Sequence, residues 1–571
     1  MTNTSPCIII QSNMEVLLNV DSTLHHEARD AIAPFTEIVK SPEHFHTYSI
    51  SHLSLWNAAS TGLTASDVLA RLKKYSSYEI PASVITEITE YMGRYGILRL
   101  VLQDGNLILE SNDEALFIEI CQRKEIQGYI ETFISKKAAI VSPFVRGKLK
   151  ILLTELGFPV QDLAGYVQGE PLDIELRNTF TLRDYQKDAA QIFYASGSEK
   201  GGSGVIVLPC GSGKTIIGMA AMALIKTHTL ILTPSVTAAR QWIRELLQKT
   251  TLTEDQVKEY SGDVKEIAPV TVATYQILTQ RKRKEKNSQL STLNSQLSPN
   301  SQLKDKEFSN FSLFESKKWG LMIYDEVHLL PAPVFRFSAD MQATRRLGLT
   351  ATLVREDHKE TEVFSLIGPK KFDIPWRILE SQGWIAKAKC HEIRIPMDTV
   401  LRMSYVVAPL REKIAIAGCN PEKFGVVKNL LEKHSKENDH ILIIGQYIEQ
   451  LETLAKEINT PLITGKTPNK ERDRIYDSFR RGEIRILMVS KVGNFAIDLP
   501  DASVLIQISG TFGSRQEEAQ RLGRVLRPKK DGRPAMFYSI VTKDSREQEF
   551  AMNRQLFLVD QGYGYEVISS Q

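Results

Sequence analysis

The chain has 571 residues, of which 42% are hydrophobic and 24% are charged, and its formal net charge is +3. This length predicts three or four domains, because single cores stop growing beyond about 250–300 residues. So small a positive charge does not by itself indicate nucleic-acid binding. The five cysteines are scattered, which excludes a disulfide framework. No apolar run reaches the roughly 18 residues of a membrane span, so we expect a cytoplasmic protein without a membrane segment.

Residues 1–110 form the first predicted unit. Thr64-Ala65-Ser66-Asp67 has the spacing of a capping box ahead of an amphipathic helix, and a second helix begins near Pro81. Alternating residues over 97–109 surround the turn dipeptide Asp104-Gly105 and predict a hairpin. Two helices followed by a hairpin favour a winged-helix-like domain, which binds DNA or docks a protein. Its mixed charges favour docking.

Three histidines in this unit, His44, His46 and His52, raise the question of a metal site. No cysteine and no clear helical spacing accompany them, so we interpret them as ordinary polar surface. The next unit, 111–172, is a smaller helical or mixed segment with an amphipathic run over 145–156.

The remainder of the chain alternates strands and helices twice, which predicts two parallel sheets with covered faces. Residues 173–376 form the first of these units, and its strands are expected at 205–208, 229–232, 270–273 and 321–324. Residues 377–571 form the second, and its strands are expected at 440–444, 484–489 and 504–508. The stretch 399–421 looks like a helical excursion from the second unit.

An insertion over 281–305 interrupts the first of these two units. The tetrapeptide Asn-Ser-Gln-Leu recurs three times in it, and such polar, low-complexity sequence cannot build a core. We expect a disordered surface loop. Its basic head, Arg281-Lys282-Arg283-Lys284, fits a solvated rim better than a nuclear-import signal or a phosphate patch.

The most informative run is Pro209-Cys210-Gly211-Ser212-Gly213-Lys214-Thr215, which follows an apolar strand and opens a predicted helix over 216–226. Glycines let backbone N–H groups approach a triphosphate, and the helix N-terminus adds its positive dipole end. Lys214 supplies a charge for the β and γ phosphates, and Thr215 supplies a hydroxyl ligand for Mg²⁺. The strict pattern has glycine where this chain has Leu208, so the match covers only G-x-G-K-T. The alternative is a glycine-rich turn that merely caps a helix.

A second signal is Asp325-Glu326-Val327-His328, at the carboxyl end of an apolar strand. Open α/β sheets bind ligands at this edge. Asp325 can hold the Mg²⁺ that Thr215 also binds, and Glu326 can orient or deprotonate the attacking water. The alternative is an acidic pair that caps the next helix.

A third signal lies in the second α/β unit. Gln520, Arg524 and Arg527 are spaced at i, i+4 and i+7, so they share one face of a predicted helix. Two guanidinium groups on one stripe suit the charge that develops on a transferring γ-phosphoryl group. We therefore predict a cleft in which one unit binds the nucleotide and metal and the other delivers arginine. Its opening and closing would move a gripped phosphate backbone.

Together these motifs resemble those of superfamily 2 helicases, and specifically of the XPB (xeroderma pigmentosum group B) family in its compact prokaryotic form. Leu182 to Gln186 resembles the Q-type motif, which implies a nucleotide contact for Arg183 and adenine recognition by Gln186. Asp325 to His328 resembles motif II, and Leu349 to Thr352 resembles motif III. Gln516 to Lys530 resembles motif VI, which implies the catalytic roles of Gln520, Arg524 and Arg527.

The resemblance also implies how hydrolysis is coupled to DNA. Arg355-Glu356-Asp357 resembles the family's R-E-D element, and Asp498 lies in a run that resembles motif V. The implied coupling residues are His328, Thr350, Thr352, Arg355, Glu356, Asp357 and Asp498. Residues 173–376 and 377–571 would be tandem RecA-like domains, 111–172 the family's damage-recognition domain, and 399–421 its thumb. That thumb is short of Lys and Arg for a segment that grips DNA.

The expected function is that of an ATP- and Mg²⁺-dependent DNA helicase with 3′ to 5′ polarity and DNA-stimulated ATPase activity. It would act on single strands and fork junctions near the nucleoid, in repair or transcription-linked DNA opening. We expect a monomer that works with a partner nuclease or repair factor. Two alternatives stay open: a translocase that moves on duplex DNA without separating it, and a DNA-binding scaffold that keeps ATP as a structural ligand.

Overall fold

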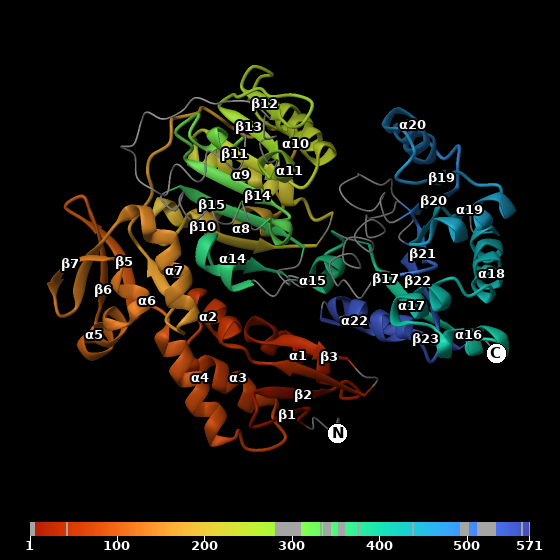
Figure 1. Ribbon diagram of the computed structural model, residues 1–571, viewed down its shortest axis with the longest axis horizontal. Helices are drawn as coiled ribbons and strands as arrows, with labels where there is room; N and C mark the ends of the chain where they lie inside the picture. Colours follow the sequence, from red (N-terminus) through yellow and green to blue (C-terminus); the bar gives the residue numbers. More distant parts are fainter. Residues whose placement is uncertain are drawn as a thin grey trace, which may run out of the picture.

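The computed structural model resolves the chain into two accessory units and two α/β domains (Figure 1). It describes residues 6–569 except 42–43, 210, 280–309, 332–333, 335–343, 352–359, 375, 385, 437–438, 491–501, 511–532 and 561–562. The insertion over 281–305 therefore lies outside the described residues. In the described part, no helix is both long and apolar enough to cross a membrane.

The first accessory unit is a four-stranded antiparallel sheet packed against helices. Its strands, in the order β1-β2-β4-β3, are β1 (Ile8–Ile10), β2 (Glu15–Asn19), β3 (Glu37–Lys40) and β4 (Phe45–Ser49). Its helices are α1 (His25–Ile32), α2 (His52–Ser60), α3 (Ala65–Tyr75) and α4 (Ala82–Arg94). The expected capping box begins α3, where Thr64 and Asp67 exchange backbone-to-side-chain hydrogen bonds of 2.9 and 3.2 Å.

The expected hairpin forms, but it belongs to the second accessory unit rather than to the first. Strands β5 (Leu98–Gln103) and β6 (Asn106–Ser111) lie in a five-stranded sheet of order β7-β8-β6-β5-β9. The other members are β7 (Ile130–Ser135), β8 (Ala138–Val141) and β9 (Val160–Asp162). Helices α5 (Glu114–Gln122), α6 (Lys124–Gln127) and α7 (Arg146–Glu155) accompany it. The expected boundary at residue 110 is therefore wrong, because β6 pairs with β8 and β5 with β9.

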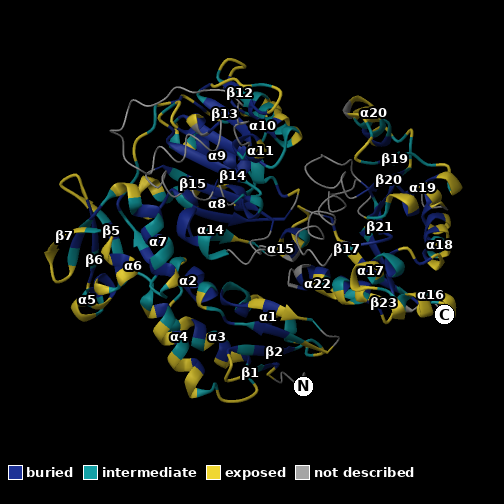
Figure 2. Ribbon diagram, in the orientation of Figure 1, coloured by how far each residue is buried: buried dark blue, intermediate teal, exposed yellow. Residues whose placement is uncertain are grey.

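The first α/β domain has seven parallel strands in the order β12-β13-β11-β14-β15-β10-β16. The strands are β10 (Ser203–Val207), β11 (Thr229–Thr233), β12 (Val257–Tyr260), β13 (Val270–Thr274), β14 (Leu321–Asp325), β15 (Arg345–Thr350) and β16 (Lys370–Asp373). The helices are α8 (Asp184–Tyr194), α9 (Lys214–Ile225), α10 (Val236–Lys249), α11 (Tyr275–Leu278) and α14 (Glu360–Leu366). The central strands are buried along their length (Figure 2), as continuous apolar runs in a parallel sheet require.

The second α/β domain repeats this plan, with order β19-β20-β18-β21-β22-β17-β23 and every pair parallel. Its strands are β17 (Ala388–Ile395), β18 (Ile441–Gly445), β19 (Leu462–Ile463), β20 (Ile486–Ser490), β21 (Val504–Gln507), β22 (Ala535–Thr542) and β23 (Tyr565–Ser569). Its helices are α16 (Thr399–Val407), α17 (Leu410–Gly418), α18 (Glu422–Lys436), α19 (Ile448–Glu457), α20 (Asn469–Arg480) and α22 (Arg546–Asp560), and α15 (Trp376–Ser381) precedes it. The predicted fold class, two tandem RecA-like domains after α+β accessory units, is confirmed.

The first accessory unit contacts both α/β domains. The side-chain oxygen of Asn57 accepts a 2.9 Å hydrogen bond from the backbone N–H of Lys370, and Trp56 lies against Phe364 with ring centroids 6.4 Å apart. On its other side, Leu556 and Val559 of α22 are part of its hydrophobic core. This unit therefore bridges the two domains.

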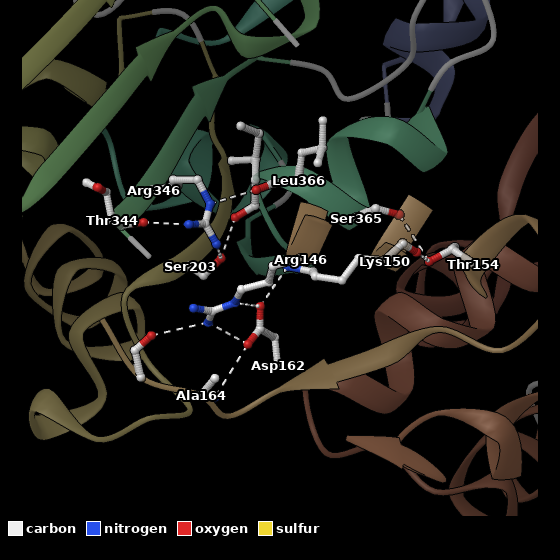
Figure 3. Close-up of polar contacts among 12 residues, drawn as sticks. Arg146, Lys150, Thr154, Asp162, Ala164, Ser203, Thr344, Arg346, Ser365 and Leu366 are labelled. Carbon is white, nitrogen blue, oxygen red and sulfur yellow. Dashed lines mark hydrogen bonds and ion pairs between the residues drawn. The ribbon is translucent and has the colours of Figure 1, made fainter. Parts of the chain in front are cut away.

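A buried polar network lies where the second accessory unit packs on the first α/β domain (Figure 3). Asp162 accepts hydrogen bonds from Arg146 at 2.6 and 3.0 Å and from Lys150 at 3.0 Å. Across the boundary, the hydroxyl of Thr154 on α7 lies 3.0 Å from that of Ser365 on α14. Burial alone raises the pKa of Asp162, but the charges of Lys150 and Arg146 outweigh it and hold that pKa well below its usual range.

On the domain side, Arg346 is 1% exposed and holds the sheet edge to α14. Its guanidinium donates to the carbonyl oxygens of Thr344 and Leu366, at 2.5 and 2.6 Å, and to the Ser203 hydroxyl at 3.1 Å. Tyr166 of the accessory unit covers this guanidinium, with 5.9 Å between its ring centroid and the guanidinium carbon. The two parts of the chain therefore share one buried interface.

Asp162→Asn should lower the free energy of unfolding by about 3 kcal/mol at pH 7, because it leaves two buried cations without their anion. The first unfolding transition in urea measures this. Asp104→Asn, the same change at an exposed hairpin turn with φ of +50°, should alter it by less than about 0.5 kcal/mol.

The stabilisation that Asp162 provides should also decrease at acid pH. The depressed pKa of Asp162 means that its stabilisation is complete above about pH 4, the ordinary carboxyl value, and is lost as the pH falls further. Equal urea midpoints for wild type and Asp162→Asn at pH 7 would contradict this account of the interface.

Candidate nucleotide site

The glycine-rich run connects β10 to α9 at the carboxyl edge of the sheet. Gly213 is the residue before α9 and has φ of +86°, a conformation that glycine adopts readily. A Cβ atom at this position would lie 2.5 Å from Nε2 of Gln186, so a side chain would displace the loop. Ser212 is fully buried, and its hydroxyl donates to the Pro209 carbonyl oxygen at 2.7 Å. Cys210 lies outside the described residues.

Two side chains of helix α8 hydrogen-bond to the glycine-rich loop. Tyr185 and Gln186 both donate to the carbonyl oxygen of Ser212, at 2.5 and 3.0 Å. The Gln186 amide oxygen accepts from the backbone N–H of Arg183 at 3.1 Å, so its side chain also caps α8. Gln186 was expected to read adenine. In the structure its amide nitrogen donates to the loop and its amide oxygen accepts from the backbone of Arg183. Adenine recognition by Gln186 stays a prediction.

The acidic pair stands at the end of β14, a central strand of the sheet, and faces the loop lysine. Nζ of Lys214 lies 3.5 Å from Oε1 of Glu326 and donates to the Leu208 carbonyl oxygen at 3.4 Å. Glu326 has φ of +50°, a strained backbone conformation for a non-glycine residue of the kind that gathers at functional sites. Oδ2 of Asp325 accepts a 3.0 Å hydrogen bond from Nε1 of Trp242.

The electrostatics of the two carboxylates differ. Burial and, after it, the neighbouring charge of Glu326 raise the pKa of Asp325 to about 6. Burial also acts to raise the pKa of Glu326, but the positive charges of Lys214 and His328 outweigh it, so this pKa is lowered. Two partly buried carboxylates thus share one nearby lysine, and a further cation would stabilise both.

The residues present fit a magnesium nucleotide. Mg²⁺ prefers carboxylate and hydroxyl oxygens, which Asp325 and Thr215, on the first turn of α9, supply. Phosphate groups suit a helix N-terminus with an adjacent lysine, and only glycine fits the tight approach at position 213. Oε2 of Glu326 is buried and makes no hydrogen bond among the described residues, and Nδ1 of His328 approaches it to 3.5 Å. A carboxylate oxygen without a hydrogen bond suits a group that binds a reactant.

His328 connects this acidic strand end to β15. It is 4% exposed, and its Nδ1 lies 2.7 Å from the hydroxyl of Thr350. Both residues were expected to couple hydrolysis to DNA, and they are in direct contact. The remaining expected site residues lie outside the described residues: Gln520, Arg524, Arg527, Thr352, Arg355, Glu356, Asp357 and Asp498.

Sequence reasoning missed three residues that shape the site. Tyr185 supports the loop, Trp242 donates to Asp325, and the Tyr275 hydroxyl donates to the backbone oxygen of Asp325 at 2.8 Å. One signal for Trp242 was available in Gly218, in the middle of α9. A Cβ atom there would lie 2.6 Å from the indole of Trp242, so the glycine admits that ring against the helix.

The chain matches known proteins along almost its whole length. The "DNA 3′-5′ helicase XPB" of Mycobacterium tuberculosis is 50% identical over 98% of this chain and 97% of the relative. The protein of the same name from Kineococcus radiotolerans is 47% identical over 99% of this chain and 96% of the relative. The chain belongs to the XPB family of DNA helicases.

Further comparisons agree with this membership. The "General transcription and DNA repair factor IIH helicase/translocase subunit XPB" of Antonospora locustae is 33% identical over 99% of this chain and 81% of the relative. Residues 379–571 match the family model "ERCC3/RAD25/XPB C-terminal helicase". Residues 8–132 match "Helicase conserved C-terminal domain", and 179–355 match "Type III restriction enzyme, res subunit". The phosphate loop and the acidic pair of this XPB-family chain lie within the last match.

Trp242→Phe should lower ATP turnover about tenfold or more, because it removes the side-chain donor to Asp325 while keeping an aromatic ring. Steady-state hydrolysis measures this, with circular dichroism to check the fold. Trp319→Phe is the matched control, since Trp319 is also buried but donates to the backbone oxygen of Leu313. Equal losses in the two variants would show that indole volume, and not the bond to Asp325, matters.

Proposed function

We propose that this protein is a motor that hydrolyses Mg²⁺·ATP and uses the energy to move on DNA and separate its strands with 3′ to 5′ polarity. The observation that carries the proposal is the approach of Lys214 to Glu326 beside the partly buried Asp325. Membership of the XPB family supports DNA as the substrate. Opening one base-pair step costs about 1.4 kcal/mol of stacking, which is small beside an ATP cycle.

Each residue of the site has a chemical task in this proposal. Lys214 binds the β and γ phosphates, and Thr215 with Asp325 holds the metal. Glu326 orients the attacking water and accepts its proton, which its lowered pKa allows because the carboxylate is ionised at neutral pH. The bound magnesium ion supplies charge stabilisation to the phosphoryl oxygens.

The second domain completes the site. Arg524 and Arg527, whose spacing from Gln520 predicts one shared helix face, are proposed to bring guanidinium groups to the charge that develops on the γ-phosphoryl group. His328 and Thr350, whose side chains meet at 2.7 Å, pass changes at Glu326 to β15. Thr352, Arg355, Glu356, Asp357 and Asp498 are proposed to carry coupling to DNA.

We also propose a cellular role for this activity. The relatives that are named as subunits of a transcription and DNA repair factor support a role in DNA repair or in transcription-linked opening. We propose that the protein acts at the nucleoid as a monomer, together with a partner nuclease or repair factor. The apolar side chains exposed on α16, such as Val400 and Met403, suit a protein partner better than a DNA backbone.

Lys214→Ala should reduce DNA-stimulated ATP turnover at least about a hundredfold, because it removes a cation from the phosphates. Glu326→Gln should cause a loss of similar or larger size, because it removes the base that accepts the proton of water. Turnover with and without single-stranded DNA measures both.

Lys187→Ala, at an exposed lysine of α8, is the control and should leave turnover unchanged. Unchanged turnover in Glu326→Gln would instead favour the scaffold that keeps ATP as a structural ligand.

A further inference from the structure

Helix α15 connects the two α/β domains and contacts both. At its start, Trp376 is buried and meets Tyr563 of the second domain edge-on, with ring centroids 6.3 Å apart. Just beyond its end, the indole of Trp384 lies over Arg183 of the first domain, with 4.5 Å from the guanidinium carbon to the ring centroid. The backbone N–H of Trp384 donates to the Leu379 carbonyl oxygen at 2.8 Å, which fixes the residue relative to α15.

Arg183 is joined to the phosphate loop by a short chain of contacts. Its guanidinium donates to the Tyr185 hydroxyl at 3.0 Å, and that hydroxyl donates to the carbonyl oxygen of Ser212. Trp384 is therefore two side chains away from the loop that is proposed to bind triphosphate. It lies among residues 379–571, which match the C-terminal helicase model, so it comes from the other half of the motor.

Two side chains on this side of the loop, Gln186 and Trp384, differ in what they offer a nucleotide base. Gln186 is 4% exposed, and its amide hydrogen-bonds to the backbone of Arg183 and of Ser212. Trp384, by contrast, is 38% exposed. A half-exposed indole beside a guanidinium is a surface on which purines stack, and such stacking is sequence-tolerant and strong.

We propose that Trp384 is a base-binding residue of the ATP site and that it stacks on the adenine next to Arg183. The base pocket is then completed across the domain junction, by a residue that no helicase motif in the sequence contains. This inference rests on the proposed binding of ATP at the phosphate loop. Because Trp376 anchors α15 to the second domain, base binding at Trp384 also ties the nucleotide to the element between the domains.

Tryptophan fluorescence can test the base contact at Trp384 without a measurement of ATP turnover. Of the five, Trp56, Trp242, Trp319 and Trp376 are each less than 5% exposed, so Trp384 is the one that a quencher in solution can reach. Acrylamide quenching of the whole protein is measured alone, with ATP, with ADP and with inorganic tripolyphosphate. ATP and ADP should lower the quenching constant about twofold, and tripolyphosphate, which has no base, should leave it unchanged.

Two variants identify the residue. Trp384→Phe should abolish the nucleotide-dependent protection, because it removes the accessible reporter, whereas Trp319→Phe should keep it. Trp384→Ala should raise KM for ATP about tenfold, a larger change than in kcat, and Trp384→Phe should recover part of that loss because phenylalanine also stacks.

Equilibrium dialysis with ATP separates the failure of this inference from the failure of the proposed function. ATP that binds without protecting Trp384, or protection by tripolyphosphate equal to that by ATP, overturns the base contact and leaves the motor intact. No binding of ATP at all overturns both.

Discussion

The proposed nucleotide site depends on the proximity of one lysine to two partly buried carboxylates. Lys214 begins α9 and Glu326 directly follows β14, and their charged atoms are 3.5 Å apart although the two residues are far apart in the chain. Neither charge is well solvated, since the two side chains are 10% and 16% exposed. Asp325 beside them has its pKa raised to about 6 by burial. Such a cluster is costly without a ligand, and binding of cation and phosphate relieves part of that cost.

The surrounding fold brings these charges together. Parallel pairing of β10, β15 and β14 places the phosphate loop and the acidic pair on the same edge of one sheet. Trp242 on α10 lies against α9 at Gly218 and reaches Asp325, so a helix–helix contact fixes the rotamer of a carboxylate. Arg346 fastens the other end of β15 to α14, under Tyr166 of the accessory unit. The accessory unit therefore supports the strand that ends at Thr350.

Much of this could be predicted from the sequence, because the strongest signals are local. The apolar runs predicted seven strands of the two parallel sheets to within one or two residues, as at Leu321–Asp325 and Val504–Gln507. Other strands of these sheets, such as β17 and β22, were not predicted. The glycine-rich run and the acidic pair follow such strands directly, so their place at the sheet edge followed from the strand assignments. The helix after the loop begins at Lys214 instead of 216, because the glycine-rich loop that is proposed to bind phosphate runs directly into the first turn of the helix.

Long-range contacts could not be predicted. The hairpin of β5 and β6 was recognised, but its pairing with β8 and β9 depends on strands tens of residues further along the chain. The contact of Trp242 with Asp325 joins residues 83 positions apart, and that of Arg183 with Trp384 joins the two halves of the motor. Neither tryptophan stands in a motif or in a distinctive spacing. Their roles follow only from three-dimensional proximity.

The most direct test of the motor is strand separation on two DNA forks, one with only a 3′ single-stranded tail and one with only a 5′ tail, while ATP turnover is recorded in the same reaction. We expect the wild type to open the 3′-tailed fork and to leave the 5′-tailed fork closed, and we expect Glu326→Gln to open neither. DNA-stimulated ATP turnover without separation of either fork, or preferential opening of the 5′-tailed fork, would overturn the proposed motor.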